Sequence, residues 1–252
     1  MSLSATSIKI IKSLRQKKFR QTYHKFTVEG VKLVGELLQQ SRYRIDQLYA
    51  LPEWEHPLAE STSLNRVTER ELGRISQLRS PNQVLAVVDL PDSSNDLPRE
   101  FGTSWSLYLD GIQSPANLGA ILRVADWFGL ATVSLGPETA DLYNHKSIQA
   151  SMGSFLRVDS YEQSLAEITA RFPELPIYGA DASGASIFTA ELPKAGVLVI
   201  GQEGQGIRAE SRPHLQNWLR IPRSSGRQAE SLNAAVAAGI ICGQIAQKTM
   251  LQ

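Results

Sequence analysis

The chain has 252 residues, 42% of them hydrophobic and 20% charged, which suits one large or two small globular domains. These proportions exclude a disordered tail, a collagen-like fibre and a coiled coil. No apolar run reaches the roughly 18 residues that cross a bilayer, and the first residues lack the apolar region of a secretory signal. Cys242 is the one cysteine, which excludes an intrachain disulfide and a Cys-rich zinc site. We therefore expect a cytoplasmic protein that makes no membrane contact.

Positive charge is concentrated at the start of the chain. Residues 1–28 contain seven basic residues and no acidic one, so the remaining 224 residues carry a net charge of −6. A basic arm on a mildly acidic body indicates a polyanionic partner such as RNA, and a solvated basic helix face is the alternative. The candidate RNA-binding residues are Lys9, Lys12, Arg15, Lys17, Lys18, Arg20 and Lys25.

The first half of the chain has the pattern of a small α/β unit. Apolar residues at helical spacing predict a helix over 28–38. Thr68 with Glu71 three residues later is a capping-box pattern, which predicts a helix that runs to residue 75. The strands predicted in this half lie at 44–51 and 83–90.

A linker is predicted at 91–103, because its first ten residues are rich in Pro, Ser, Asn and Asp. It would join a domain at 1–95 to a domain at 104–252, in which strands and helices alternate. Alternation of this kind predicts a parallel sheet with helices on both faces. The strands predicted there are 106–110, 131–135, 176–180 and 196–201, and the helices are 118–128, 162–172 and 232–248.

Three turns that contain glycine follow or border the predicted strands, at 109–129, 197–207 and 219–240. Parallel sheets bind ligands at the carboxyl ends of their strands, where these turns lie. None of them matches a dinucleotide or P-loop motif, and a turn without a ligand is the alternative. The four histidines are scattered, with no metal-ligand spacing, and no nucleophile elbow is present. We therefore expect no metal site.

Together, the three turns resemble a known set of motifs. NLGAILR at 117–123, GQEGQG at 201–206, and Ile221-Pro222 with Ser231-Leu232-Asn233 are similar to the SpoU (TrmH-type) branch of the SPOUT RNA methyltransferases. NHKSIQASMGSFLRV at 144–158 resembles the stretch between the first two motifs of that family. KFTVEGVKLVGELL and LRSPNQVLAVV resemble its substrate-binding domain. The resemblance covers nearly the whole chain in the family's order.

The resemblance implies a fold, a cofactor and a reaction. It implies a C-terminal α/β domain with a deep trefoil knot and a smaller N-terminal α/β domain like a ribosomal protein, which binds RNA. It further implies S-adenosylmethionine as methyl donor, a ribose 2′-hydroxyl of RNA as acceptor, and a homodimer. Ribosomal RNA is favoured over transfer RNA. The alternatives are a transfer RNA methyltransferase, a non-catalytic RNA-binding or ribosome-assembly paralogue, and a nucleotide-binding enzyme of unrelated chemistry.

The catalytic residues implied by the resemblance begin with Arg123. Helical side chains lean toward the N-terminus, so Arg123 should reach back over Gly119. Because guanidinium groups stay protonated, we expect it to clamp an RNA phosphate and stabilise the reacting oxygen, with base action secondary. Asn117 either caps its helix or orients this arginine. Glu203 either binds Arg123 or RNA-facing donors, or is solvated.

The remaining implied residues lie near the last two motifs. Ser231 precedes the last helix and is positioned to cap it, while Asn233 should lie in its first turn. The cofactor-binding residues implied are Gly201, Gly204, Ile221 and Leu232, where the glycines allow close backbone approach. Arg223 departs from the family, which often has Met there, and the loop before Ser231 is slightly longer. This departure leaves the edge of the adenine site undefined.

Small residues are unusually frequent in the last predicted helix. Gly239 and Gly243 each lower helix propensity by roughly 1 kcal/mol relative to Ala, so a compensating contact is expected. In the family, this helix and the one that carries Arg123 pack across a two-fold interface. The resemblance therefore implies a dimer built on these helices, and packing against the chain's own sheet is the alternative.

Overall fold

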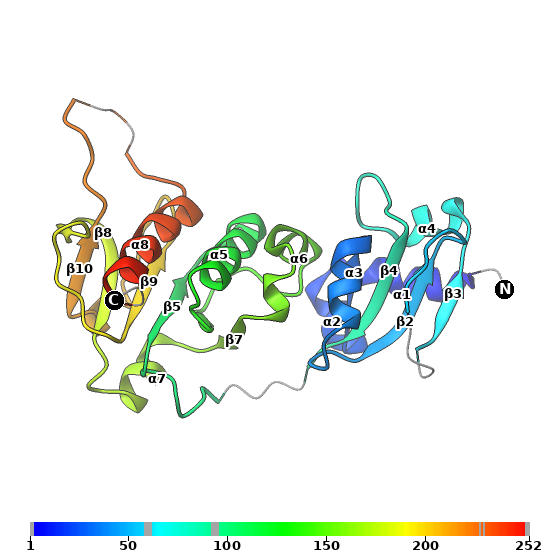
Figure 1. Cartoon of the computed structure of the whole chain (residues 1–252), viewed down its shortest axis with the longest axis horizontal. Coiled ribbons are helices and arrows are strands. Elements are labelled where there is room, and N and C mark those ends of the chain that lie inside the picture. The colour runs from blue at the N-terminus through cyan, green and yellow to red at the C-terminus, as the bar shows by residue number, and fades with distance from the viewer. Residues whose placement is uncertain (1–2, 58–61, 92–95, 227, 229, 250–252) are drawn as a thin grey trace. The chain divides into compact units, whose positions relative to one another are not determined.

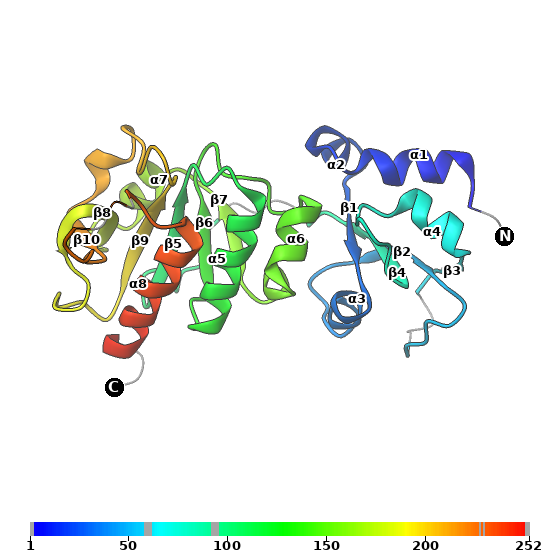
Figure 2. The same ribbon diagram turned by 90° about the horizontal axis from the view of Figure 1, so that it is seen from above.

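The computed structural model describes residues 3–57, 62–91, 96–226, 228 and 230–249. The chain divides into two compact units, each with its own sheet (Figures 1 and 2). Unit 1 contains Met1–Ser93 and Asp141–Leu156, and unit 2 contains Ser94–Ala140 and Arg157–Gln252.

Unit 1 contains a four-stranded mixed sheet in the order β1-β4-β2-β3, in which β4 is antiparallel to both of its neighbours. Its strands are β1 (Lys25–Glu29), β2 (Ile45–Ala50), β3 (Leu64–Arg66) and β4 (Val84–Asp89). The helix predicted over 28–38 begins later, as α3 (Val31–Leu38). Its first residues instead belong to β1, and Gly30, at φ 110°, makes the turn between strand and helix.

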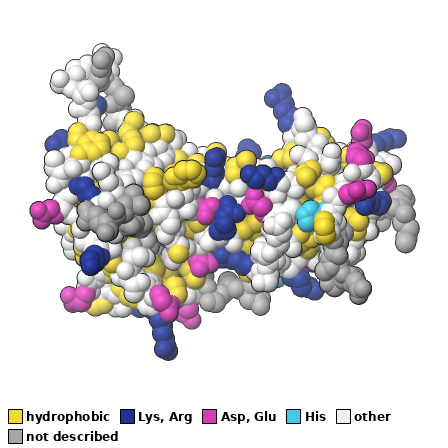
Figure 3. Space-filling model, viewed as in Figure 1, with side chains coloured by type: hydrophobic (Ala, Val, Ile, Leu, Met, Phe, Trp, Pro, Cys, Tyr) yellow, Lys and Arg dark blue, Asp and Glu magenta, His cyan; other side chains and the backbone are white. Residues whose placement is uncertain are grey.

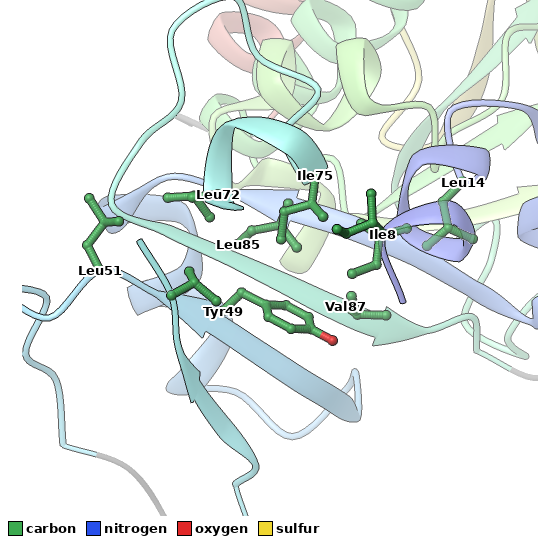
Figure 4. Close-up of a cluster of buried hydrophobic side chains, with 10 residues drawn as sticks. Ile8, Leu14, Tyr49, Leu51, Leu72, Ile75, Leu85 and Val87 are labelled. Atoms are coloured by element: carbon green, nitrogen blue, oxygen red, sulfur yellow. The ribbon is translucent and has the colours of Figure 1, made fainter. Parts of the chain in front are cut away.

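The basic arm of the sequence folds into two helices, α1 (Ala5–Ser13) and α2 (Lys17–Tyr23). Ile8, Ile11 and Leu14 are buried in a cluster with strand residues and α4 (Glu69–Ile75). Figure 4 shows Ile8 and Leu14 in this cluster. The predicted capping box of α4 is confirmed, because Thr68 and Glu71 bond each other's backbone N–H groups. The arm is therefore an amphipathic part of the unit 1 core, with its lysines on the outer face.

A segment from the second half of the chain completes unit 1. It contains α6 (His145–Ser151) and the 3₁₀ turn Ser154–Leu156. The ring of Tyr143 lies 4.7 Å from that of Phe26, and the ring of Phe155 lies 5.6 Å from that of Tyr43. The linker prediction assigned 104–252 to one domain, whereas the structure groups 141–156 with unit 1 through this aromatic cluster. Local sequence patterns do not report such a long-range contact.

Unit 2 contains a six-stranded sheet in the order β10-β8-β9-β5-β6-β7, with every neighbouring pair parallel, as the sequence predicts. Helices α5 and α8 lie on one face and α7 on the other (Figure 2). The strands are β5 (Trp105–Asp110), β6 (Thr132–Leu135), β7 (Asp159–Glu162), β8 (Ile177–Ser186), β9 (Gly196–Gly201) and β10 (Asn217–Arg220). The helices are α5 (Pro115–Trp127), α7 (Leu165–Arg171), the 3₁₀ turn Arg212–His214, and α8 (Ala234–Thr249).

Several boundaries of unit 2 differ from the sequence prediction. The helix predicted from residue 162 begins at Leu165, because Glu162 ends β7 and Ser164 caps α7. Leu97 and Phe101 lie within the predicted linker, yet both are buried in a core cluster with α7. The connection between the units is therefore shorter than 91–103.

The small residues of α8 face α5 of the same chain. A Cβ built on Gly243 would lie 3.3 Å from Phe128 Cζ, and one built on Gly239 would lie 3.7 Å from Val124 Cγ2. Ala238 is fully buried. A helix of the same chain thus offers the compensating contact expected for the two glycines, in place of the chain's own sheet, and a dimer built on α5 and α8 stays a prediction.

None of the helices in the described part of the chain is long and apolar enough to span a membrane.

Candidate active site

Three polar side chains from distant motifs meet beside the sheet of unit 2. Asn117 lies in the first turn of α5, Glu203 in the turn after β9, and Asn233 directly before α8. Asn117 Nδ2 donates to Glu203 Oε1 at 2.7 Å, and Asn233 Nδ2 donates to the same oxygen at 2.6 Å and to Asn117 Oδ1 at 3.0 Å. The structure therefore brings together three of the five catalytic residues that the sequence predicts.

Asn233 also forms the cap of α8. Its Oδ1 accepts hydrogen bonds from the backbone N–H groups of Ala235 and Val236, and Ala234 N–H donates to Glu203 Oε1 at 3.1 Å. The predicted cap, Ser231, is exposed and has no hydrogen-bond partner among the described residues. The assignment of the cap to Ser231 is wrong because the helix begins at Ala234, one residue after Asn233. A helix N-terminus favours an anionic group such as the Glu203 carboxylate.

Glu203 is presented by a tight turn between Gln202 and Gly206. These two residues exchange backbone hydrogen bonds of 3.1 and 2.8 Å, which close the turn. The turn packs directly on Gly201, where a Cβ would lie 2.3 Å from the carbonyl carbon of Gly206. The missing side chain of Gly201 therefore lets the chain's own backbone pass close to it, whereas the resemblance implies that Gly201 binds the cofactor. Gly204 has open space where a side chain would be.

Asn117 is free for the site because another residue caps α5. Ser114 Oγ accepts from the N–H of Asn117 at 3.4 Å, and Pro115 follows the cap at the first helical position. The helix therefore starts earlier than the predicted 118–128. Of the two roles considered for Asn117, helix capping is wrong. The sequence analysis missed Ser114, although Ser followed by Pro at a helix start was an available signal.

Arg123 lies further along α5 and is exposed. Its guanidinium has no hydrogen-bond or ion-pair partner within the part of the chain that the structure describes. Gly119, one turn earlier, is buried. Glu203 is held by the two asparagines and not by Arg123, so the alternative of a direct ion pair between them is not realised. The guanidinium is therefore available to an external anion.

The two oxygens of Glu203 have different surroundings. Oε1 accepts from Asn117, Asn233 and the N–H of Ala234, while Oε2 has no partner among the described residues. A carboxylate accepts several hydrogen bonds and donates none when ionised. One oxygen thus fixes the local structure, and the other remains an acceptor for a substrate donor.

The remaining candidate cofactor residues lie between β10 and α8. Ile221 follows β10 and is half-buried, and Leu232 precedes the α8 cap and is 46% exposed. An exposed apolar side chain of this size can contact a flat apolar group such as an adenine ring. Arg223 is exposed in the same loop.

The seven basic residues proposed for RNA binding separate into two groups. Arg20 is only 3% exposed and pairs with Asp141, while Lys25 contacts Asp46 and Asp89 at 3.1 and 2.7 Å. Arg15 is exposed but donates to the backbone oxygen of Ser76 at 2.8 Å. Arg20 is wrong as an RNA contact, because its charge is buried and neutralised within unit 1. The exposed lysines of the set are Lys9, Lys12, Lys17 and Lys18.

No three side chains of His, Cys, Asp or Glu gather in a way that would hold a metal ion within the described ranges.

Comparison with known proteins matches both units. Residues 104–243 match the SpoU rRNA methylase family, and residues 5–86 match the MRM3-like substrate binding domain. The chain is 30% identical, over 93% of each chain, to the 23S rRNA (guanosine(2553)-2′-O)-methyltransferase RlmP of Bacillus subtilis.

Solved structures match over the whole chain. A Porphyromonas gingivalis protein assigned to the TrmH family of RNA methyltransferases has 36% identity and a TM-score of 0.86 over 100% of both chains. An AdoMet-bound rRNA methyltransferase from Sinorhizobium meliloti has 26% identity and a TM-score of 0.85 over 98% of this chain and 96% of that one.

Proposed function

Because the chain belongs to the SpoU rRNA methylase family, we propose that it transfers a methyl group from S-adenosylmethionine to a ribose 2′-hydroxyl of ribosomal RNA. One observation carries the proposal beyond family membership. Asn117, Glu203 and Asn233, one from each of the three motif segments, form a single hydrogen-bonded cluster. RlmP is named as a methyltransferase of a guanosine 2′-hydroxyl in 23S rRNA, which supports ribosomal RNA as the substrate class.

Arg123 acts on the RNA in this proposal. Its exposed guanidinium, which has no partner among the described residues, binds a phosphate next to the reacting ribose and stabilises negative charge as it develops on the 2′-oxygen. Because guanidinium groups hold their proton in proteins, base action is secondary. The main contribution is therefore to hold the ribose in line with the methyl group.

Glu203 and its partners orient the RNA-facing side of the site. Oε1 is committed to Asn117, Asn233 and the start of α8, so Oε2 is left to accept a hydrogen bond from the RNA. Ser231, exposed two residues before Asn233, lies next to this cluster in sequence and has no role in capping α8. We assign it a substrate-facing role.

The cofactor is held by the turns after β9 and β10. Ile221 and Leu232 would hold the adenine, and Gly204 would leave room beside the backbone. Gly201 contributes indirectly, because it allows the turn that carries Glu203 to close. When bound, S-adenosylmethionine supplies an electrophilic methyl group. The deep trefoil knot of the SPOUT fold, formed by the chain around these turns, is part of the proposal.

We also propose a cytoplasmic homodimer. Trp127, at the end of α5, is 84% exposed, and Val236, in the first turn of α8, is 50% exposed. Figure 3 shows hydrophobic side chains at the surface over these two helices. Exposed apolar side chains of this size are typical of protein–protein interfaces. Trp127→Glu and Val236→Glu are expected to give monomers in sedimentation, and a wild-type monomer at micromolar concentration would exclude the dimer.

Within unit 1, the RNA-binding side chains proposed are Lys9, Lys12, Lys17 and Lys18, with Arg15 and Lys25 at the edge of this group. Contacts with phosphates make affinity fall steeply with salt. Reversing the charge of Lys9 and Lys12 together is expected to weaken RNA binding and to flatten its dependence on salt. Unchanged affinity would mean that these lysines form only a solvated helix face.

The activity is tested with purified protein, radiolabelled S-adenosylmethionine and separate ribosomal and transfer RNA. Label on ribosomal RNA, in a nucleotide that resists cleavage by alkali, is the expected result. Label on transfer RNA alone would show that the substrate is transfer RNA and not ribosomal RNA. Cofactor binding without any transfer, together with RNA binding, would indicate a non-catalytic paralogue. The matching 2′-O-methyl group should be missing from a strain that lacks the protein.

A further inference from the structure

A buried carboxylate lies at the end of β5, directly before the first motif. Asp110 has no exposed surface, and its oxygens accept three hydrogen bonds. Arg208 donates from its backbone N–H at 2.7 Å and from Nε at 2.8 Å, and Ser211 Oγ donates at 2.9 Å. All three donors come from the turn that follows the Glu203 segment. Asp110 therefore fastens this turn to the central strand of the sheet.

Two chain segments connect Asp110 and its partner Arg208 to the cluster of Asn117, Glu203 and Asn233. From Asp110, the backbone runs through Gly111, at φ 71°, to the start of α5 and Asn117. From Arg208, it runs back through the closed turn at Gln202–Gly206 to Glu203. The segments 110–117 and 203–208 are thus joined at one end by Asp110 with Arg208 and at the other by Asn117 with Glu203. Because the two segments are joined at both ends, a displacement at the first junction is expected to change the geometry of the second.

Stability alone explains this arrangement poorly. Asp110 is fully buried and Arg208 is 20% exposed, and the desolvation cost of burying a charged group commonly cancels much of the attraction to its partner, so the pair is weak evidence for a stabilising role. Its three directional bonds do fix the turn in one position. Arg208 is held further by Glu138, 3.8 Å from its other arm. Burial lowers the pKa of the Arg208 guanidinium, but its hydrogen bond and charge attraction to Asp110 outweigh this together with the charges of Tyr108 and Glu138, so the pKa is raised.

We propose that Asp110 is a positioning residue for methyl transfer, which holds the turn at 202–208 so that Glu203 Oε1 meets Asn117 and Asn233. The inference rests on the proposed function, since it assigns Asp110 a role in that reaction. Asp110 itself does not touch the substrate. Its effect reaches the reaction through Glu203, with Oε2 of that residue aimed at the RNA.

The test compares Asp110→Asn with Asp181→Asn in the full-length protein. Asp181 is an apt control because it also lies in unit 2 and pairs with the neighbouring 3₁₀ turn, 3.6 Å from Arg212. Asp110→Asn keeps the shape of the side chain, but it replaces one acceptor oxygen by an NH₂ group that faces the donors of Arg208 and Ser211. We expect kcat at saturating substrates to fall about tenfold or more, and Asp181→Asn to stay within about twofold of wild type. Ser211→Ala, which removes one of the three bonds, should cause a smaller loss and covers the case in which Asp110→Asn does not fold.

A double variant separates positioning from a general loss of stability. If Asp110 acts through Glu203, Asp110→Asn should add less than about threefold to the defect of Glu203→Gln, because coupled residues are not additive. Hydrogen exchange gives a readout without activity: the amides of 202–206 should exchange faster in Asp110→Asn and not in Asp181→Asn. Wild-type kcat in Asp110→Asn, or full multiplication of the two defects, would overturn the inference. A wild-type protein without methyl transfer would overturn the proposed function instead, and the exchange data would still test the role of Asp110 in holding the turn.

Discussion

Asn117 Nδ2 and Glu203 Oε1 lie 2.7 Å apart, although 86 positions separate the two residues in sequence. Neither side chain would be constrained in this way by its own segment, since one lies on a helix and the other in a turn. Their bond, together with those of Asn233, links the starts of α5 and α8 to the turn after β9. The site is therefore a property of three chain segments held in register by the parallel sheet.

Replacing Asn233 separates its two roles. Asn233→Ala removes the α8 cap and the bonds to Glu203, so we expect a loss of about 1 kcal/mol in stability and a lower rate of methyl transfer. Asn233→Asp keeps a capping oxygen but places a second carboxylate beside Glu203. Its effect on activity should therefore be stronger than its effect on thermal stability. Thermal melts and initial rates measure both effects. Ser231→Ala is the control, expected to leave stability unchanged, and an equal loss from it would restore Ser231 as the cap.

Arg123→Ala is expected to lower methyl transfer by about 10²–10³-fold, the usual cost of losing one group that stabilises developing charge. Cofactor affinity, measured by calorimetry, should stay near the wild-type value because the side chain points to the RNA in our proposal. Arg123→Lys retains the charge without the planar fork and should recover only part of the rate. Wild-type turnover in Arg123→Ala would refute the assignment.

The segment 141–156 is expected to stabilise unit 1. A chain of residues 1–93 lacks the rings of Tyr143 and Phe155 against Phe26, and it leaves Arg20 buried without Asp141. Loss of a large buried aromatic side chain typically costs about 3–5 kcal/mol. Denaturation followed by circular dichroism should therefore show a less stable protein than the same chain with 141–156 appended through a flexible linker. Equal stability of the two chains would contradict the grouping of this segment with unit 1.

Cys242 provides a probe of α8. The side chain is fully buried, and burial raises the pKa of its thiol from 9.0 to about 12. Because the thiolate is the reactive form, the folded protein should resist thiol reagents at pH 8, well below that pKa, and react rapidly once unfolded. Reaction kinetics across a denaturant series measure this. Val236→Ala, on the exposed side of the helix, should not change the protection, whereas rapid labelling of the native wild type would show that α8 is not packed on α5.

Much of the catalytic unit follows from the sequence by itself. Strands 106–110, 131–135 and 196–201 are short apolar runs bounded by turn residues, and the structure confirms them with small shifts at their ends. Their alternation with helices also predicts the parallel sheet. The capping box at Thr68 is equally local, because both partners lie within one helical turn. Such features are visible in sequence because the interactions that create them join neighbouring residues.

Only the tertiary structure decided which side chains serve the site and which serve the fold. Arg20 and Lys25 have the same local signature as Lys9, yet Arg20 is buried against Asp141, 121 positions away. Gly243 accommodates Phe128 of its own chain, although its spacing from Gly239 equally suits a partner's helix. Asp110, which the motif pattern did not single out, closes the link between two motifs through donors 98 and 101 positions away. In each case the deciding energy is a contact or a desolvation between distant segments, which no local pattern encodes.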